Sequence, residues 1–226
     1  MKEQICLFPT LYLFPVTWES VREKEEEWIS LLPQKRREEL QKIQNKQARI
    51  QSLSGEILIR RIIKALLGLD AFQWDRDRGA RGKPFFSQIP FFHYNISHTE
   101  GLVVCAVAGF PMGVDAEGLG RDAPLEVMRR IMTPSERATI LQLPKGKKQT
   151  HLFFELWTRK EAYVKWTGEG ITGAMNTVEV VKPPFVDQIS TFQWNRWIIS
   201  VCCESKQIFE KKEVPLPLFL SGEWKP

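Results

Sequence analysis

Charged residues interrupt the apolar face of a predicted helix within His151–Ile171. At about 100° per residue, the aromatic and aliphatic side chains of this stretch fall on one face, as a core-facing helix requires. Lys160 falls within that face, Glu161 at its edge, and Lys165 one turn after Glu161. A surface ion pair would explain Glu161 and Lys165, but an ordinary amphipathic helix keeps charges away from its aromatic side chains. The pattern therefore favours a carboxylate and ammonium groups held at a functional site.

Two carboxylates stand two residues apart after the apolar run Leu102–Phe110. In an extended segment, residues two apart point to the same face, so Asp115 and Glu117 would lie side by side. Like charges repel unless a cation lies between them, and paired oxygen ligands are what proteins usually offer Mg²⁺. A solvated turn would also explain an isolated Asp-x-Glu. Combined with Glu161, the pair predicts a three-carboxylate magnesium site.

Small polar and basic residues gather further upstream in two short blocks. Gly82-Lys83-Pro84 predicts a stiff loop that presents one cation. Asn95-Ile96-Ser97-His98 places a hydroxyl and an imidazole at the end of a predicted strand. These groups suit phosphate binding, although His98 by itself would be explained by a hydrogen-bonded structural histidine.

These blocks, in this order, resemble the motifs of the surfactin-synthetase-activating (Sfp-type) class of 4′-phosphopantetheinyl transferases. That family carries Gly-Lys-Pro, then Phe-Asn-x-Ser-His-Ser, then (Val/Ile)-Gly-(Val/Ile)-Asp-x-Glu, and then Trp-(Ser/Thr)-x-Lys-Glu-(Ser/Ala)-x-x-Lys before Gly-x-Gly. The corresponding residues here are Gly82–Pro84, Tyr94–Thr99, Met112–Glu117, Trp157–Lys165 and Gly168–Gly170. The joint match is highly specific and covers roughly residues 33 to 171.

The resemblance implies a reaction in which the 4′-phosphopantetheine arm of coenzyme A moves to a serine of an apo acyl or peptidyl carrier protein domain. Adenosine 3′,5′-bisphosphate would be released. By the same resemblance, Mg²⁺ is held by Asp115, Glu117 and Glu161, with Glu161 as the general base. Lys165 would stabilise the phosphate oxygens. Asp115, Glu161 and Lys165 are therefore the candidate catalytic residues.

The resemblance also implies a site for coenzyme A as co-substrate. The Gly82-Lys83-Pro84 loop would hold adenine and His98 the 3′-phosphate. Two positions depart from the family: Glu38 stands where some members have a second lysine, and Gln51 where many have arginine. We therefore expect weaker or altered coenzyme recognition, with Arg49 as the substitute for the missing arginine. The candidate coenzyme-binding residues are Lys35, Arg49, Lys83, Pro84, Ser97, His98 and Lys165.

The fold implied by the resemblance is α+β, with two similar α+β halves related by an approximate twofold and the active site in the cleft between them. We expect residues 1–110 to form the N-terminal half, on the coenzyme A side. Residues 111–226 would form the C-terminal half, with the metal site and the helix that carries Glu161. Because one chain contains both halves, a monomer is expected.

Helices are predicted where the apolar periodicity is 3.6 residues. An apolar stripe predicts one helix over Arg36–Leu67, which Gly68 would end. Thr133-Pro134-Ser135-Glu136 is a capping box with proline at the first helical position, so a short helix should follow it. Lys145–Lys148 predicts a mobile basic loop before the helix that carries Glu161. Gly168 and Gly170 are expected to end that helix.

Strands are predicted where short apolar runs alternate with polar residues or turn residues. The N-terminal run Ile5–Val16 indicates an edge strand, because Pro9 and Pro15 interrupt it. Other strands are expected at Phe91–Ile96, Leu102–Phe110, Val178–Val181, Phe192–Cys203 and Val214–Phe219.

Composition limits the partners and the compartment. A chain of 226 residues with 43% hydrophobic content can bury one large core or two small ones. No run of about 18 apolar residues occurs, so no membrane partner is expected. Cys6, Cys105, Cys202 and Cys203 show no metal-ligand spacing, which suits a cytoplasmic location. The net charge of +5 suits nucleic acid, a membrane surface or an acidic protein, and charge alone does not choose among them. The resemblance implies an acidic protein, since carrier domains are typically acidic.

Two alternatives use the same residues differently. A magnesium-dependent phosphohydrolase or nucleotidyl transferase could use Asp115, Glu117 and Glu161 on another substrate, and it would turn over without a carrier protein. A noncatalytic nucleic-acid-binding protein would account for the pI of 9.0. It would give no reason for the three carboxylates, which repel phosphates, so no nucleic-acid partner is expected.

Overall fold

The computed structural model describes residues 7–79, 82–168 and 175–226, so Cys6 and Gly170 lie outside the described residues. The chain forms two compact units, each of which mixes helices with strands, and the expected α+β class is confirmed. Unit 1 contains the described residues up to Gly79, then Pro84–Gly109 and Phe209–Pro226. Unit 2 contains Lys83 and Phe110–Ile208. Residues 209–226, expected in the second half, thus lie with unit 1.

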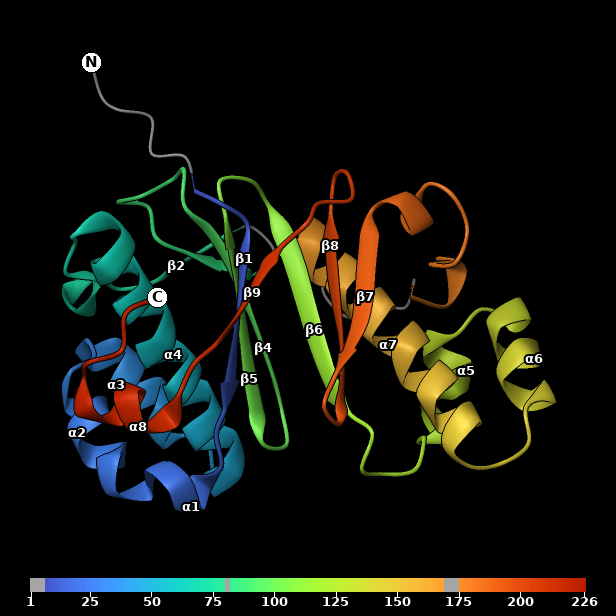
Figure 1. Ribbon diagram of the computed structural model, residues 1–226, viewed down its shortest axis with the longest axis horizontal. Coiled ribbons are helices and arrows are strands. Elements are labelled where there is room, and N and C mark those ends of the chain that lie inside the picture. The colour runs from blue at the N-terminus through green and yellow to red at the C-terminus, as the bar shows by residue number, and fades with distance from the viewer. Residues whose placement is uncertain (1–6, 80–81, 169–174) are drawn as a thin grey trace. The chain divides into compact units, whose positions relative to one another are not determined.

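A four-stranded sheet is the framework of unit 1 (Figure 1), and its order is β4-β5-β1-β9. The strands are β1 (Thr10–Pro15), β4 (His93–Thr99), β5 (Leu102–Ala108) and β9 (Glu210–Glu213). β5 pairs antiparallel with β1 and β4, whereas β9 lies parallel to β1. The prediction that the N-terminal strand is an edge strand is therefore wrong. Pro9 precedes β1 and Pro15 is its last residue, so neither ring removes a donor from the middle of the ladder.

Helices cover one face of this sheet and close the core of unit 1 (Figure 1). They are α1 (Trp18–Val21), α2 (Glu25–Ser30), α3 (Gln34–Gln41), α4 (Lys46–Leu67) and α8 (Leu216–Ser221). Alternate residues of β1 and β5, such as Tyr12, Phe14 and Val103, pack against Trp28 and Phe219 in one apolar cluster. A short antiparallel pair, β2 (Asp77–Arg78) and β3 (Pro84–Phe85), completes unit 1.

Two predictions for unit 1 are corrected by local capping. The single helix expected over Arg36–Leu67 is two helices, because the Asn45 side chain accepts a hydrogen bond from Ala48 N at 2.9 Å and starts α4 afresh. Gly68, with a φ of 68°, ends α4 as expected. The strand expected at Val214–Phe219 is largely helix α8, because Pro215 and Pro217 suit the start of a helix.

Unit 2 is built on an antiparallel three-stranded sheet with the order β6-β8-β7. Its strands are β6 (Met112–Gly118), β7 (Ile189–Trp194) and β8 (Trp197–Cys203), and its helices are α5 (Met128–Ile131), α6 (Pro134–Gln142) and α7 (Lys147–Thr167). The strand expected over Phe192–Cys203 is a hairpin that turns at Asn195, whose φ is 51°. Val178–Val181 forms a turn instead of the expected strand.

Capping residues determine where helices of unit 2 begin and end. Thr133 accepts a hydrogen bond from Glu136 N, and Glu136 accepts one from Thr133 N, so the predicted capping box is confirmed. Gly168, with a φ of 73°, ends α7. Lys147 and Lys148, expected in a loop, form the first turn of α7 instead. Along the described ranges, none of the helices is both long enough and apolar enough to cross a bilayer.

β6 and α7 approach each other closely at Gly113. A Cβ atom at this position would come within 3.0 Å of Ala162 O, Trp166 N and Lys165 C, all of which are backbone atoms. Only glycine permits this contact. Because residues alternate along a strand, Asp115 and Glu117 share the face of Gly113 and point toward α7.

We predict that Gly113→Ala destabilises the protein by about 3 kcal/mol, because backbone atoms must move apart to accept the methyl group. Urea unfolding followed by circular dichroism measures the change. Gly109→Ala is the matched control, since a Cβ there meets nothing within 4 Å. Equal stability of the two variants would contradict the prediction.

Candidate functional site

The carboxylates predicted to bind metal lie on the facing surfaces of β6 and α7. Asp115 and Glu161 are buried, with 6% and 9% of their surface exposed, and Glu117 is half-buried. Lys165, one turn after Glu161 on α7, places its Nζ 2.6 Å from Asp115 Oδ1. The structure thus brings together Asp115, Glu161 and Lys165, the three candidate catalytic residues.

Electrostatics show how tightly this group is clustered. Burial and then the negative charge of Asp115 raise the pKa of Glu161 to about 7. Lys165 opposes the shift and Glu117 adds to it. Charges interact this strongly only at short range in a poorly solvated site. Asp115 and Glu117 therefore act electrostatically on Glu161, and their combined negative charge favours additional positive charge.

A complete metal cage is not assembled. Across 7–79, 82–168 and 175–226, no three His, Cys, Asp or Glu side chains converge closely enough to hold an ion. The chain's own cations neutralise the two β6 carboxylates: Lys165 pairs with Asp115, and Arg121 Nη2 lies 2.8 Å from Glu117 Oε2. The donor set nevertheless fits Mg²⁺, because crowded carboxylates supply hard oxygen ligands and need positive charge.

Lys160, the lysine on the apolar stripe of α7, has a structural role. Its Nζ lies 2.8 Å from Glu136 Oε2, and both side chains are almost fully buried, at 1% and 2% exposure. Lys160 also donates to the carbonyl of Met175 at 2.9 Å and to that of Val178. Burial lowers the pKa of Lys160, and the hydrogen bond that Lys160 donates to Glu136 opposes this. Lys160 therefore ties α7 to the cap of α6 and to the segment after α7.

Lys83 does not present a free cation as the sequence suggested. Its Nζ donates to the carbonyl of Met112 at 2.8 Å and to that of Trp166 at 3.5 Å. Burial lowers the pKa of Lys83 to about 8. The side chain thus joins the start of β6 to the last turn of α7, next to the contact at Gly113.

The residues that depart from the family pattern make structural contacts in unit 1. Gln51 is buried and donates to the carbonyl of Thr99, and Glu38 accepts a hydrogen bond from Gln34 at 2.9 Å. Arg49, the expected substitute, is already paired: its Nε lies 2.5 Å from Glu25 Oε1 and its Nη1 donates to Ile43 O. In this arrangement its guanidinium is committed to protein groups.

Two other candidates are neighbours on β4 in unit 1. Ser97 is buried and His98 is exposed, as expected for consecutive residues of a strand, which point to opposite faces. Ile96, on the face of His98, contacts the Gly55 position of α4, so His98 lies on the helix-covered face of the sheet. The two residues therefore cannot present their side chains to the same side of β4.

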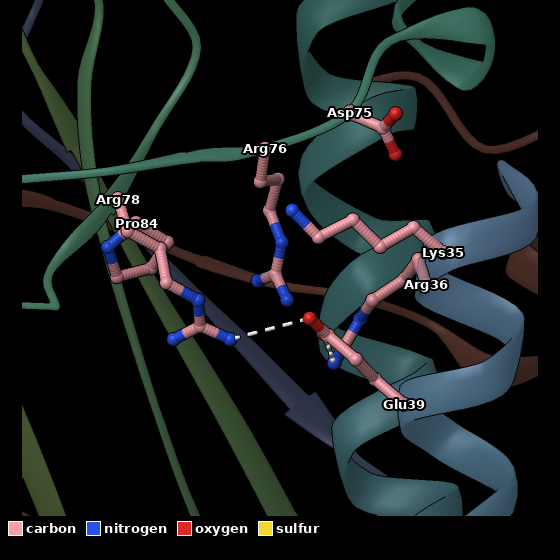
Figure 2. A pocket seen from close by; sticks show the side chains of 7 residues that line it. All are labelled: Lys35, Arg36, Glu39, Asp75, Arg76, Arg78 and Pro84. Carbon is pink, nitrogen blue, oxygen red and sulfur yellow. Dashed lines mark hydrogen bonds and ion pairs between the residues drawn. The ribbon is translucent and has the colours of Figure 1, made fainter.

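A basic hollow surrounds Lys35 in unit 1, between α3 and the β2–β3 segment (Figure 2). Its lining includes Pro84 and four basic side chains but only two acidic ones: Lys35, Arg36, Arg76, Arg78, Glu39 and Asp75. Figure 2 shows Lys35 extending from α3 toward Arg76, while Arg78 reaches Glu39 at 3.5 Å. We call this site the basic hollow. It unites two predicted coenzyme-binding residues, Lys35 and Pro84.

Buried ion pairs hold the floor of the basic hollow in place. Glu56 on α4 is fully buried and pairs with Arg36 at 2.9 Å, Arg60 at 2.8 Å and Arg76 at 3.1 Å. The four basic side chains of the lining outnumber Glu39, Asp75 and Glu56 together, so the hollow keeps surplus positive charge. Burial acts to raise the pKa of Glu39, but Arg36 and then Arg78 hold it below its usual value.

Sequence reasoning assigned no role to Arg76, Arg78 or Arg121. Arg76 and Arg78 stand just before the Gly82-Lys83-Pro84 block, and Arg121 stands four residues after Glu117. That proximity to the motifs was the available signal. Their pairing with Glu56, Glu39 and Glu117 required the fold.

Comparisons with known proteins cover both units. Residues 16–109 match a family model described as the N-terminal part of 4′-phosphopantetheinyl transferases, and residues 111–213 match the 4′-phosphopantetheinyl transferase superfamily. The chain belongs to the 4′-phosphopantetheinyl transferase superfamily. The resemblance of the motifs is thereby confirmed, and the phosphohydrolase and nucleic-acid-binding alternatives gain no support.

Curated relatives agree with this membership. The 4′-phosphopantetheinyl transferase psf-1 of Bacillus pumilus is 37% identical over 126 residues, which are 56% of this chain and 53% of that protein. The 4′-phosphopantetheinyl transferase Sfp of Bacillus subtilis (strain 168) is 29% identical over 159 residues, 70% of each chain. The match thus spans about half the length of the Bacillus pumilus relative. These relatives place the chain in the Sfp-type class of transferases.

We predict that Lys160→Met costs about 3–5 kcal/mol of stability, because it leaves Glu136 buried without a countercharge. Chemical unfolding measures the loss. Lys160→Met combined with Glu136→Gln should recover a large part of it, since no buried charge remains and the cap of α6 is kept. A loss below about 1 kcal/mol, the range of an exposed pair, would contradict the structural role of Lys160.

Proposed function

We propose that the chain transfers the 4′-phosphopantetheine arm of coenzyme A to a serine of an apo acyl or peptidyl carrier protein. The observation that carries the proposal is the cluster of Asp115, Glu117, Glu161 and Lys165 between β6 and α7, in a chain of this family. The serine oxygen forms a bond to the β-phosphorus, and the bond from that phosphorus to the bridging oxygen breaks. Adenosine 3′,5′-bisphosphate leaves with that oxygen.

The chemistry demands positive charge and a base, and the cluster supplies both. Asp115, Glu117 and Glu161 would hold Mg²⁺, which when bound neutralises charge on the pyrophosphate. Lys165 lies on the same face of α7 as Glu161 and would bind a phosphate oxygen, which requires it to share its pairing with Asp115. Glu161 would accept the proton of the serine hydroxyl as the oxygen attacks.

Unit 1 would supply the cations for another part of the coenzyme. We propose that Lys35 and Arg78, at the rim of the basic hollow, bind the 3′-phosphate of coenzyme A. Arg78 thereby compensates for Glu38 and Gln51, which offer no positive charge. His98 would assist in binding the 3′-phosphate. Lys83 and Pro84 would position the adenine through their backbone atoms. Ser97 would also contact the coenzyme. Arg49 contributes only after leaving Glu25.

The partners follow from the same reaction. A carrier protein is the second substrate, and its acidic surface complements the net charge of +5. The relative from Rattus norvegicus, 27% identical over 179 residues, is named L-aminoadipate-semialdehyde dehydrogenase-phosphopantetheinyl transferase. That name, which joins a dehydrogenase to a phosphopantetheinyl transferase, supports an enzyme as a partner class. A cytoplasmic location and a monomeric state stay predictions of the sequence.

Intact-mass spectrometry tests the reaction on an apo acyl carrier protein and an apo peptidyl carrier domain, each incubated with the protein, coenzyme A and Mg²⁺. We expect a gain of ~340 Da on the carrier serine, the mass of the transferred arm, and its loss with EDTA. Glu161→Gln should reduce the rate by about 100-fold or more, because it removes the base and a metal ligand.

Glu155→Gln is the matched control for this variant, since Glu155 lies on the same helix with only long ion pairs to His151 and Arg159, at 4.0 and 3.8 Å. It should keep the wild-type rate. Hydrolysis of coenzyme A without any mass gain on either carrier would support the phosphohydrolase alternative. A wild-type rate in Glu161→Gln would remove Glu161 from the mechanism.

Coenzyme analogues test the basic hollow. Lys35→Ala and Arg78→Ala should each raise the KM for coenzyme A about 10-fold, the loss expected for one charge-assisted hydrogen bond. With 3′-dephospho-coenzyme A the variants and the wild type should have the same KM, because the phosphate they bind is missing. Steady-state kinetics with either carrier provide both values.

Lys42→Ala removes an exposed positive charge from the end of α3, outside the hollow, and serves as the control. It should leave both KM values unchanged. If Lys35→Ala and Arg78→Ala raised the KM for coenzyme A and for its dephospho analogue equally, the hollow would bind another part of the coenzyme.

A further inference from the structure

A second, larger hollow lies in unit 2 at the N-terminus of α7. It encloses about 1350 Å³, part of it open to solvent, and the loop after β6, the start of α7 and the β7–β8 turn form its walls. The basic hollow of unit 1 holds only about 280 Å³. The larger hollow is therefore of a size to receive a segment of a macromolecule. We call it the α7 hollow.

The α7 hollow is strongly basic. Arg121, Lys147, His151 and Arg196 line it, against one acidic side chain, Asp122. Several contacts fix these groups in place. The Arg121 guanidinium lies 5.1 Å from the Phe154 ring centre, the Arg196 guanidinium lies over the ring of its neighbour Trp197, and His151 contacts Gln193 at 3.3 Å.

The basic side chains at the N-terminus of α7 are unfavourable for the helix. A helix N-terminus carries partial positive charge and favours acidic residues in its first turn. The first turn of α7 has no acidic residue; it contains Lys147 and Lys148, and His151 follows one turn later. A local arrangement that lowers helix stability is expected at functional positions. An anionic partner would offset the unfavourable charge of the first turn.

The α7 hollow is connected to the carboxylate cluster. Arg121 lines the hollow and also pairs with Glu117 at 2.8 Å. Along α7, His151 precedes Glu161 by ten residues, which is about 15 Å of helix. A domain of about 100 residues has a radius of gyration of about 13 Å. A single small carrier domain can therefore contact the hollow while its serine reaches Glu161.

We propose that the α7 hollow is the docking site for an acidic segment of the carrier protein. This inference rests on the proposed function, because it names where the second substrate binds. The acidic side chains of the carrier pair with Lys147 and Arg196 in the hollow. Basic charge at the hollow also accelerates the encounter with an acidic protein, and this acceleration is weakened by salt.

Lys147→Glu separates docking from folding. An acidic residue in the first turn of α7 should stabilise the helix, so any loss of carrier binding cannot come from unfolding. We expect the Kd for a fluorescently labelled apo acyl carrier protein or apo peptidyl carrier domain to rise about 10-fold, with a smaller dependence on salt. The KM for the carrier should rise equally, while the KM for coenzyme A stays unchanged. Arg196→Glu should behave in the same way.

Lys206→Glu is the matched control, because Lys206 is an exposed lysine of the same unit that follows the opposite end of β8. It makes the same change in net charge and should leave carrier binding unaltered. An equal effect of Lys206→Glu and Lys147→Glu would overturn the docking site in favour of a general charge effect. So would a Lys147→Glu variant that binds both carriers like the wild type.

These experiments distinguish failure of the carrier docking site from failure of the proposed transfer reaction. If the wild type binds an apo carrier through Lys147 but transfers nothing to it, docking is supported and the proposed reaction is overturned. If the wild type transfers the arm but Lys147→Glu leaves the carrier Kd unchanged, the reaction stands and docking is overturned. A rise in the KM for coenzyme A alone would assign the α7 hollow to the coenzyme and overturn the carrier site. No binding of either carrier to the wild type overturns docking as well.

Discussion

The direct contact between β6 and α7 at Gly113 is the constraint on which the arrangement of the charged residues of these two elements depends. Because no side chain stands at Gly113, the backbone of α7 rests against the strand, and Lys165 of α7 reaches Asp115, which lies on the same face of β6 as Gly113. Lys83 reinforces the contact by bonding to carbonyls of both elements. A bulkier residue at Gly113 would separate the carboxylates even if every functional side chain were kept.

Local signals in the sequence predicted local structure well. Three such signals are confirmed by the structure: the capping box at Thr133, the glycine that ends α7, and the strand alternation that places Asp115 and Glu117 on one face. Each depends only on neighbouring residues. Pairing between distant segments was not predictable in this way. The parallel contact of β9 with β1 moves the last described residues into unit 1 and makes β1 an interior strand. Nothing in the composition of Glu210–Glu213 indicates that partner.

The same limit applies to the candidate site. Residue type and spacing indicated Glu161, Asp115 and Lys165, because the motifs that contain them occur together and in a specific order. They could not show how individual cations are used, since that depends on which carbonyl or carboxylate the fold places beside each one. Lys160 and Lys83 stabilise the framework through buried contacts, whereas Arg78 and Arg121, which carried no motif, lie at the hollows. A buried lysine and an exposed arginine carry the same charge in the sequence, but in the structure the first stabilises the fold and the second lines a surface hollow.

The cations that neutralise the carboxylate cluster differ in how firmly they are held. Lys165 pairs with a buried carboxylate, Asp115, and the Lys165 side chain is 28% exposed, so removing its charge would leave repulsion in a poorly solvated site. Arg121 is 57% exposed where it pairs with Glu117, and exposed pairs contribute only about 0–1 kcal/mol. Glu117 can therefore exchange Arg121 for another cation at little cost, while Asp115 keeps its partner. Lys165 and Arg121 thus offset the charges of Asp115 and Glu117, and Glu117 has the more exposed and weaker of the two pairs.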